Sequence, residues 1–507
     1  METILAFDLG TGGVKAALYQ ACGNCPCLAE AFLEYSTFNP AGLPGYREQR
    51  PSDWWGAVLS STQAVLQRAR LSGDTVQAIG LSGHSLGMVA LDQRGNLLEE
   101  YTPIWSDDRA DKQADEYFKR IPYETWYRTT GNGFPRGTYP LFKILWKKQH
   151  HQEIFNRAVC YIGTKDYINY LLTGVIATDP SYASGCGGYN LKKRAYSSTL
   201  FDAAELSPAI FPSIINSGAV IGGLTGDAAT ALGLKKGIKV ICGGVDNGLM
   251  ALGARCMEEG DHYLSLGTSS WIALASKEPV LDFQKKPYVF DHVIEDRYIS
   301  STCIFSAGYT LRWVRDQFFS EWDPETAYDE INRLAKDVPP GSRGLFFNPS
   351  LAGGSEIEPS HNIRGAIAGL EQCHTRGDIA RAAMEGVALN LKTARNVLSG
   401  YKALQPRMLI VGGGAKSALW RQIFADVFQI DIQITQVQQS AAALGAAALC
   451  AQALEICDIK TVLDEAHGNE EITHPGKWVS AYQSIHPRFE KAAELIAQLS
   501  LLCRDKD

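Results

Sequence analysis

Two similar stretches of alternating apolar runs and glycine-containing turns lie about half the chain apart. The first, Ile4–Tyr19, has the sequence ILAFDLGTGGVKAALY, and the second, Tyr263–Ala275, has the sequence YLSLGTSSWIALA. Each stretch predicts a strand, a tight turn and a second strand. Because Leu-Gly-Thr recurs at the same place in both, the pattern indicates a duplicated unit, with two domains that face each other across a ligand.

The first turn, Gly10–Gly13, has the composition of a phosphate site. Glycines let successive backbone N–H groups approach an anion closely. Asp8 at the strand end would repel a bare phosphate, so its carboxylate fits best beside a divalent cation or its waters. Ser265 stands at the matching place of the second stretch, so only the first copy is expected to serve a metal. The alternative interpretation is a plain β-hairpin.

A third apolar run, Val76–Leu81, predicts a strand that ends shortly before His84 and Ser85. Ligands in open α/β sheets bind beyond the carboxyl ends of the strands. His84 and Ser85 are therefore candidates to hydrogen-bond a polar substrate, and a simple turn between strands is the alternative.

Trp105 and Asp107 form another polar and aromatic group, next to a guanidinium at Arg109. An apolar ring face beside charged hydrogen-bonding groups suits a polyol. The alternative is a helix cap with its ion pair.

Asp246 occupies a turn between a predicted strand, Lys239–Cys242, and a predicted helix that starts near Leu249. The preceding glycines leave room around its carboxylate, which makes Asp246 a candidate general base. The alternative is that Asp246 only caps the helix.

A third glycine turn, Gly412–Gly414, lies between a predicted strand, Met408–Val411, and a predicted helix, Leu419–Phe428. Such a turn binds phosphate at the helix N-terminus or flanks a nucleoside. An alanine-rich helix at Ala441–Ala453 is expected to pack around that site. The Gly- and Ser-rich segment Asp179–Tyr189 is expected to be a loop over the first domain.

Length and composition narrow the class of protein. A chain of 507 residues exceeds what one core usually supports, which predicts two domains. A net charge of −7 disfavours nucleic acid or an anionic membrane as a partner, and no apolar run approaches the roughly 20 residues of a membrane helix. No secretory signal pattern is evident, because Asp8 interrupts the first apolar run.

The twelve cysteines are scattered, which fits reduced thiols in a cytoplasmic protein. Cys22, Cys25 and Cys27 form a cluster whose spacing could suit zinc. Because no fourth ligand is evident, a position in the turn after the second predicted strand is the favoured interpretation.

The motif order DLGT…LSG…W-x-D-x-R…GGxDN…LGTS…GGGA-x-S-x-LWRQ resembles the FGGY carbohydrate kinases, and among them the xylulokinases. The resemblance runs over nearly the whole chain. It implies an α/β protein of two ribonuclease-H-like, actin-type ATPase domains with an active-site cleft between them. The expected boundaries are 1–247 for sugar binding and the catalytic base, and 248–507 for ATP binding.

The resemblance also implies roles for individual residues. Asp246 falls on the catalytic base, and Asp8 on the acid near Mg²⁺, which it would reach through water. The expected sugar-site residues are His84, Ser85, Trp105, Asp107, Asp246 and Asn247, and the expected ATP-site residues are Gly10, Thr11, Gly12, Gly13, Gly267, Thr268, Gly308, Gly412, Gly413, Gly414 and Ala415.

The implied activity is transfer of the γ-phosphoryl group of Mg·ATP to a ketopentose, with D-xylulose first. One segment departs from the xylulokinase pattern Gly-Gln-Met-His-Gly: this chain has Gly83-His84-Ser85-Leu86-Gly87. Ribulose, another ketose or a polyol therefore stay open as substrates. An actin-fold ATP switch and a sugar sensor without catalysis are the alternatives from other classes, and a homodimer is the assembly considered.

Overall fold

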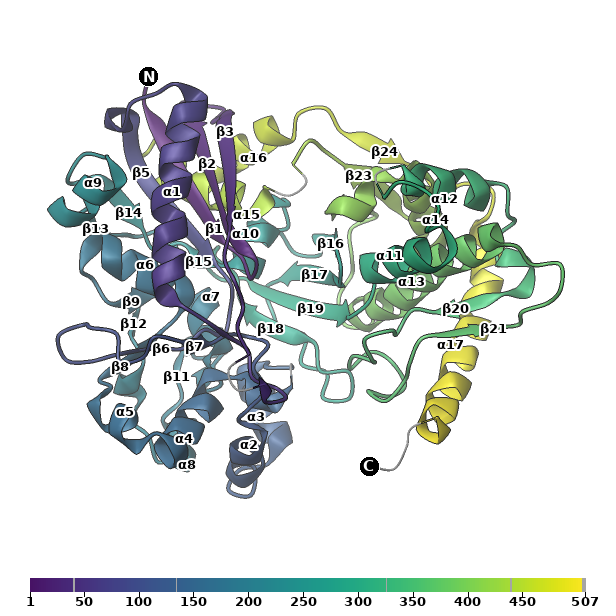
Figure 1. Ribbon diagram of the computed structural model, residues 1–507, viewed down its shortest axis with the longest axis horizontal. Helices are drawn as coiled ribbons and strands as arrows, with labels where there is room; N and C mark the ends of the chain where they lie inside the picture. The colour runs from purple at the N-terminus through teal and green to yellow at the C-terminus, as the bar shows by residue number, and fades with distance from the viewer. Residues whose placement is uncertain (40–41, 134, 325, 438–439, 504–507) are drawn as a thin grey trace.

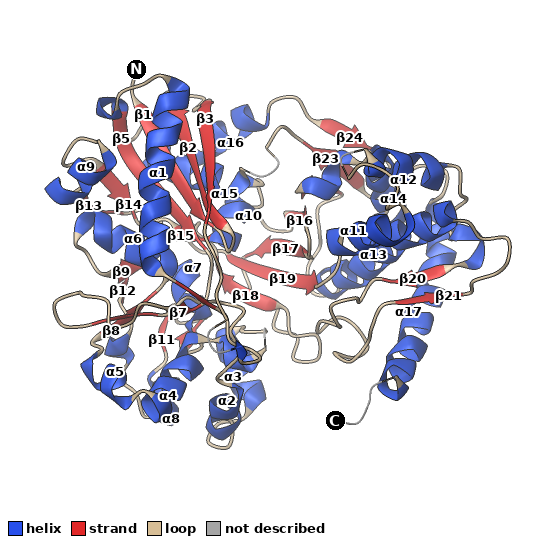
Figure 2. Cartoon of the chain, in the orientation of Figure 1, coloured by secondary structure: helices blue, strands red, loops and turns tan. Residues whose placement is uncertain are grey.

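The computed structural model describes residues 1–39, 42–133, 135–324, 326–437 and 440–503, and within them two large mixed β-sheets lie next to each other, each flanked by helices (Figures 1 and 2). The first sheet has the order β13-β14-β5-β1-β2-β3, with β15 beside β5. Its strands are β1 (Thr3–Leu9), β2 (Gly13–Gln20), β3 (Cys27–Glu34), β5 (Val76–Gly83), β13 (Val220–Gly223), β14 (Lys239–Ile241) and β15 (Gly244–Val245).

The second sheet has the order β18-β19-β17-β16-β22-β23-β24. Its strands are β16 (His262–Leu266), β17 (Ser270–Ser276), β18 (Tyr288–Asp291), β19 (Tyr298–Ile304), β22 (Arg407–Val411), β23 (Asp431–Ile434) and β24 (Glu471–Thr473).

The two sheets follow one plan. In the first, β1 pairs antiparallel with β2 and parallel with β5, β5 pairs parallel with β14, and β13 closes the edge antiparallel. In the second, β16, β17, β22, β23 and β24 repeat these pairings in the same order. The duplication predicted from the two Leu-Gly-Thr hairpins is thus confirmed.

Helices cover both faces of the first sheet, which explains why β1 is a continuous apolar run rather than an alternating one. The helix α1 (Pro51–Ala69) packs against β2 and β3. The helix α15 (Ala441–Ala453) packs against β1 and β5 on the other face, although it belongs to the C-terminal half of the chain (Figure 1).

This position of α15 corrects the expectation that the helix packs around the third glycine turn. Its small side chains let it fit between the first sheet and α10 (Asp246–Gly253). A Cβ atom at Gly445 would lie 2.3 Å from the Leu249 carbonyl oxygen, so the contact between the two helices requires glycine there.

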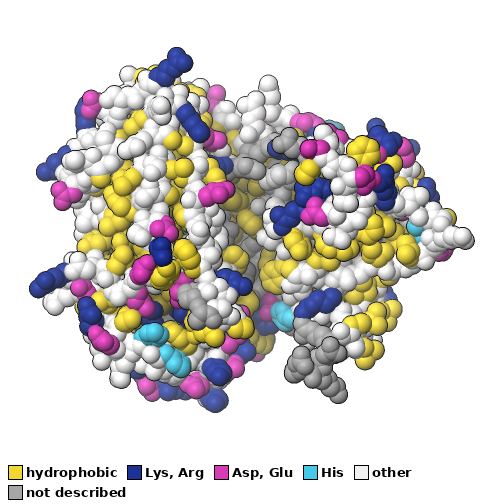
Figure 3. All heavy atoms as spheres, in the orientation of Figure 1, with side chains coloured by type: hydrophobic (Ala, Val, Ile, Leu, Met, Phe, Trp, Pro, Cys, Tyr) yellow, Lys and Arg dark blue, Asp and Glu magenta, His cyan; other side chains and the backbone are white. Residues whose placement is uncertain are grey.

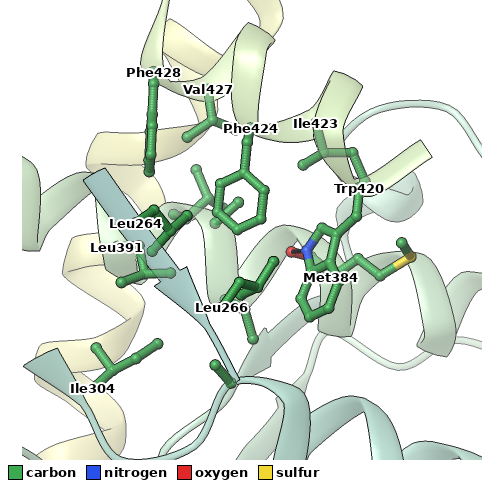
Figure 4. Close-up of a cluster of buried hydrophobic side chains, with 14 of the residues drawn as sticks. Leu264, Leu266, Ile304, Met384, Leu391, Trp420, Ile423, Phe424, Val427 and Phe428 are labelled. Atoms are coloured by element: carbon green, nitrogen blue, oxygen red, sulfur yellow. Dashed lines mark hydrogen bonds between the residues drawn. The ribbon is translucent and has the colours of Figure 1, made fainter. Parts of the chain in front are cut away.

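The core of the second half gathers around two helices, α13 (Arg376–Ser399) and α14 (Ala418–Phe428). The indole of Trp420 donates a hydrogen bond of 3.0 Å to the Met384 carbonyl, which joins α14 to α13 (Figure 4). Leu264 and Leu266 of β16 and Phe424 of α14 fill the space beside this bond.

The chain between β5 and β14 forms a mostly helical lobe next to the first sheet (Figure 2). Residues 179–189 of this lobe are predicted from the sequence to be a loop. They contain instead α7 (Pro180–Ala183) and a short 3₁₀ helix, Ser184–Cys186. Asp179 caps α7 by accepting a hydrogen bond from the Ser181 N–H, and the Pro at the first helical position favours the start. The remaining helices of the lobe are α2 (Asp111–Tyr117), α3 (Tyr123–Thr130), α4 (Pro140–His150), α5 (Gln152–Arg157), α6 (Thr164–Thr173), α8 (Ser198–Ala204) and α9 (Gly226–Leu232).

Within the described ranges, none of the helices has both the length and the apolar composition needed to cross a bilayer. Cys22 and Cys25 lie in the turn between β2 and β3, as favoured from the sequence, whereas Cys27, expected in the same turn, is the first residue of β3. All twelve cysteines are free thiols.

Candidate active site

Asp8 and Ser82 meet at the carboxyl edge of the first sheet. The parallel register of β1 and β5 places them opposite each other, and the Ser82 hydroxyl donates a hydrogen bond of 2.8 Å to Asp8 Oδ1. Burial raises the pKa of Asp8 above its usual value. Because burial makes the ionised form of Asp8 costly, a nearby cation would stabilise its carboxylate.

Asp246 lies at the same edge. Its strand, β15, pairs with β5 at Ser82 and Gly83, and α10 begins at Asp246 itself. Val245 is the N-cap residue, so Asp246 is not the cap that the alternative interpretation required. Gly243 permits the approach: its φ is +72°, and a Cβ there would lie 1.9 Å from the Leu81 carbonyl oxygen.

The carboxyl group of Asp246 is half-buried and accepts a hydrogen bond of 2.8 Å from the Asn247 N–H. Burial, and then the negative charge of Asp8, raise the pKa of Asp246 to about 7. A carboxyl group with such a pKa exchanges its proton readily near neutral pH, as a general base must. The two acids, far apart in the sequence, therefore share one electrostatic site.

Side chains from three segments hold the first hairpin turn in place. The Tyr35 hydroxyl donates to the Gly10 carbonyl, and Gln49 Nε2 donates to the Thr11 carbonyl at 2.7 Å. Trp105 Nε1 donates to the Thr11 hydroxyl at 2.8 Å. Sequence reasoning missed Tyr35 and Gln49, because neither follows a predicted strand nor lies in a glycine motif.

The imidazole of His84 points into the protein rather than into open space. It is 1% exposed, its Nε2 lies 3.2 Å from Thr164 Oγ1, and its ring packs edge-on against Trp54. Burial lowers its pKa to about 4, so the ring is neutral at physiological pH. The Tyr182 hydroxyl also donates to the His84 carbonyl at 2.8 Å. The predicted sugar contact of His84 stays a prediction, since the imidazole already has a partner in the protein.

Ser85 contacts β18 of the second sheet. It is 9% exposed, and its hydroxyl interacts with that of Tyr288, the first residue of β18. Negative charge on Asp246 raises the pKa of Tyr288, after the larger effect of burial. Ser85, Tyr288 and Asp246 therefore converge from three separate elements.

Trp105 and Asp107 differ in what they offer to a ligand. Trp105 is 39% exposed and lies beside the first turn. Asp107 is fully buried, and it accepts hydrogen bonds from the Arg47 N–H at 2.7 Å and from Arg109 Nε at 2.8 Å. Arg109 is also paired with Glu48. Asp107 thus fixes the loop that carries Trp105, and a direct contact between Asp107 and sugar stays a prediction.

A cavity of about 640 Å³ opens in the second half, beside the second hairpin turn and the third glycine turn. Predicted nucleotide residues from separate parts of the chain line it together. A Cβ at Gly413 would meet no atom within 4 Å, so this glycine faces empty space. Gly412 (φ +102°) and the buried Ala415 belong to the same turn but are not among the residues that line the cavity, so their predicted contact with ATP stays a prediction. The lining includes Gly267, Thr268, Gly308, Gly413, Gly414, Arg312, Tyr328, Lys416 and Trp420.

Two family models match the chain. The N-terminal domain of the FGGY family of carbohydrate kinases matches residues 3–253, and the C-terminal domain of the same family matches residues 262–454. The chain belongs to the FGGY family of carbohydrate kinases. It is therefore a phosphotransferase that acts on a small carbohydrate, with ATP as the phosphoryl donor of the family.

The relatives of this FGGY kinase are named after different substrates. The chain is 30% identical to a xylulose kinase from Staphylococcus epidermidis over 457 residues, which cover 89% of this chain and 88% of the relative. It is 28% identical to a gluconokinase from Bacillus licheniformis, with coverage of 96% and 94%.

The similar solved structures are also named after these two substrates. A ligand-bound xylulose kinase from Lactobacillus acidophilus matches with a TM-score of 0.89 at 26% identity, and covers 98% of this chain and 99% of its own. A gluconate kinase from Lactobacillus acidophilus matches with a TM-score of 0.89 at 27% identity and 98% coverage of both chains. The predicted two-domain α/β fold is thus confirmed, and the sugar stays open.

Proposed function

We propose that this FGGY kinase phosphorylates a ketopentose, with D-xylulose as the first candidate and D-xylulose 5-phosphate as its product. The observation that carries the proposal is the position of Asp246. This residue lies beside Asp8 and the first hairpin turn, and its pKa is raised to about 7. The first-half residues form the sugar site in this proposal, and the 640 Å³ cavity takes the adenosine of ATP. Figure 3 shows a hollow on this face between the two halves of the molecule.

The reaction needs correct placement and charge compensation more than covalent chemistry. Asp246 takes the proton of the sugar hydroxyl as that oxygen bonds to the γ-phosphorus, and the bond between the γ-phosphorus and the ADP oxygen breaks. The Gly10 and Gly267 N–H groups close their own turns by donating to the Gly13 and Ser269 carbonyls. In this proposal the neighbouring N–H groups of Thr11, Gly12 and Thr268 donate hydrogen bonds to phosphate oxygens.

The acids at the cleft fit a bound Mg²⁺. Asp8 and Asp246 are carboxyl groups whose like charges oppose each other, and a cation between them and the phosphates would remove that repulsion. Among the described residues no group of three His, Cys, Asp or Glu side chains could hold a metal, as is usual where Mg²⁺ binds one or two carboxylates together with phosphates. Asp8 would hold the ion through water, and the ion would offset phosphate charge.

Gluconate is the second candidate substrate, because gluconate kinases are among the relatives and the Gly83–Gly87 segment departs from the xylulokinase pattern. The boundary after residue 247, a cytoplasmic location and a homodimer stay predictions.

The test is a coupled ADP-release assay with D-xylulose, D-ribulose, glycerol and D-gluconate, followed by ³¹P NMR of the product to identify the phosphorylated carbon. Rapid turnover of D-xylulose, at least tenfold above the others in kcat/KM, supports the proposal. Preferred turnover of D-gluconate would replace the ketopentose by an aldonate.

A further inference from the structure

Tyr288 reaches the sugar site from the second sheet, although the expected sugar residues belong to the first half. The Tyr288 hydroxyl interacts with that of Ser85, and Asp246 lies close enough that its negative charge raises the pKa of Tyr288, after the larger effect of burial. A Cβ at Gly185 would lie 3.1 Å from Tyr288 Oη and 3.0 Å from Leu86 Cδ2. Tyr288 is therefore enclosed on that side by the same turn that departs from the xylulokinase pattern.

The first half of the chain holds both backbone neighbours of Tyr288. The Tyr127 hydroxyl donates to the Pro287 carbonyl at 3.0 Å, and the Val289 N–H donates to the Gly131 carbonyl at 2.8 Å. Two residues further on, the Asp291 N–H donates to Ser184 Oγ at 3.2 Å. Tyr288 is thus fixed to the half that carries Asp246, so it is a rigid wall rather than a mobile lid.

The other side of Tyr288 faces a separate cavity of about 380 Å³. This cavity lies between the lobe of the first half and the second sheet, and Arg136, Lys286 and Glu356 are among its lining residues. Tyr288 therefore lies between the region of Asp246 and Ser85 and this additional space.

On this basis, and resting on the proposed kinase function, we propose that Tyr288 and Ser85 form the wall that selects the sugar. The two hydroxyls, each able to donate and accept, pair with the sugar hydroxyls next to the reacting one. An epimer with a hydroxyl on the wrong side leaves one of these buried groups unpaired. The ring of Tyr288 closes the 380 Å³ cavity to the sugar and so limits its length.

The test compares Tyr288→Phe, Ser85→Ala and the matched control Tyr117→Phe, which removes a buried tyrosine hydroxyl that donates a hydrogen bond of 3.1 Å from α2 to the Leu200 carbonyl of α8. The quantity is the ratio of kcat/KM between D-xylulose and D-ribulose, which differ in one stereocentre. Because one unpaired buried group costs about 1–3 kcal/mol, we expect each site variant to change the ratio roughly 5- to 150-fold. The KM for ATP should stay constant, and the control should leave the ratio as in wild type.

An unchanged ratio in both site variants, with folding verified by thermal melting, would overturn the role of Tyr288 and Ser85. If Tyr288→Phe does not fold, Ser85→Ala alone decides. A wild-type enzyme that phosphorylates neither ketopentose would refute the proposed function instead, a result visible before any variant is made. Tyr288→Ala adds a second readout: turnover of a six-carbon ketose should rise relative to D-xylulose, and no gain would contradict the length limit.

Discussion

Trp105 Nε1 donates a hydrogen bond of 2.8 Å to the Thr11 hydroxyl, so the loop expected to meet the sugar touches the turn expected to meet the phosphates. Thr11 is held from a second side by Gln49, whose amide in turn accepts a hydrogen bond of 2.9 Å from Trp54 Nε1. The two substrates of the reaction would thus meet at one connected set of side chains.

This link predicts that Trp105→Phe lowers kcat. The variant keeps an aromatic face for the sugar and removes only the donor, and losing a hydrogen bond of about 1 kcal/mol corresponds to a roughly fivefold effect. Thr11→Val removes the same bond from its other end. In steady-state assays the double variant should therefore be little worse than either single one, whereas effects that multiply would show that the bond is irrelevant.

Asp8→Asn should raise the Mg²⁺ concentration needed for half-maximal activity and lower kcat, because the carboxylate expected to hold the hydrated ion loses its charge. The matched control is Ser82→Ala, which removes the hydrogen bond to Asp8 but leaves the carboxylate. A magnesium titration of both variants checks this. Equal titration curves for Asp8→Asn and wild type would make Asp8 a structural residue.

Gly413→Leu should raise the KM for ATP by tenfold or more without loss of thermal stability. A side chain at this position meets no protein atom nearby and would enter the 640 Å³ cavity. Gly23→Leu is the control, since Gly23 also has open space around it but lies in the turn between β2 and β3. An unaltered KM for ATP in Gly413→Leu would place the adenosine elsewhere.

The elevated pKa of Asp246 has a consequence for stability. The folded state binds the proton of Asp246 up to about pH 7, while the unfolded chain releases it near pH 3.8, so ionisation of this group destabilises the fold as pH rises through that window. Asp246→Asn should therefore raise the Tm relative to wild type, by more at pH 8 than at pH 5. Calorimetric melts at both pH values test this, with the exposed Asp202→Asn as control. A Tm difference that does not change with pH would contradict the elevated pKa.

Much of the fold could be predicted from the sequence, because the signals that decide it are local. Each hairpin is a short apolar run with its glycine turn, and Asp246 is marked by the glycines before it. Helix α7, which follows its cap residue Asp179, was not predicted, because the Gly and Ser content of the surrounding segment outweighed the single capping signal. The position of α15 was missed because small residues predict close packing but not the partner.

Contacts between distant segments could not be predicted. Tyr288, Tyr35 and Gln49 reach the site through space, and nothing in their own neighbourhoods marks them. Likewise the sequence suggested that His84 faces a ligand, whereas Thr164, eighty positions further along, is its partner in the structure. Which side of a strand-end turn faces the cleft depends on the element that packs behind it.

The most direct test of the account is the rate of sugar phosphorylation by Asp246→Asn, measured at saturating Mg·ATP with the best substrate of the wild type. Loss of a general base predicts a fall in kcat of about 10²- to 10⁴-fold, with ATP affinity by calorimetry unchanged. A variant that keeps kcat within a few-fold of wild type would contradict the role of Asp246 as the base.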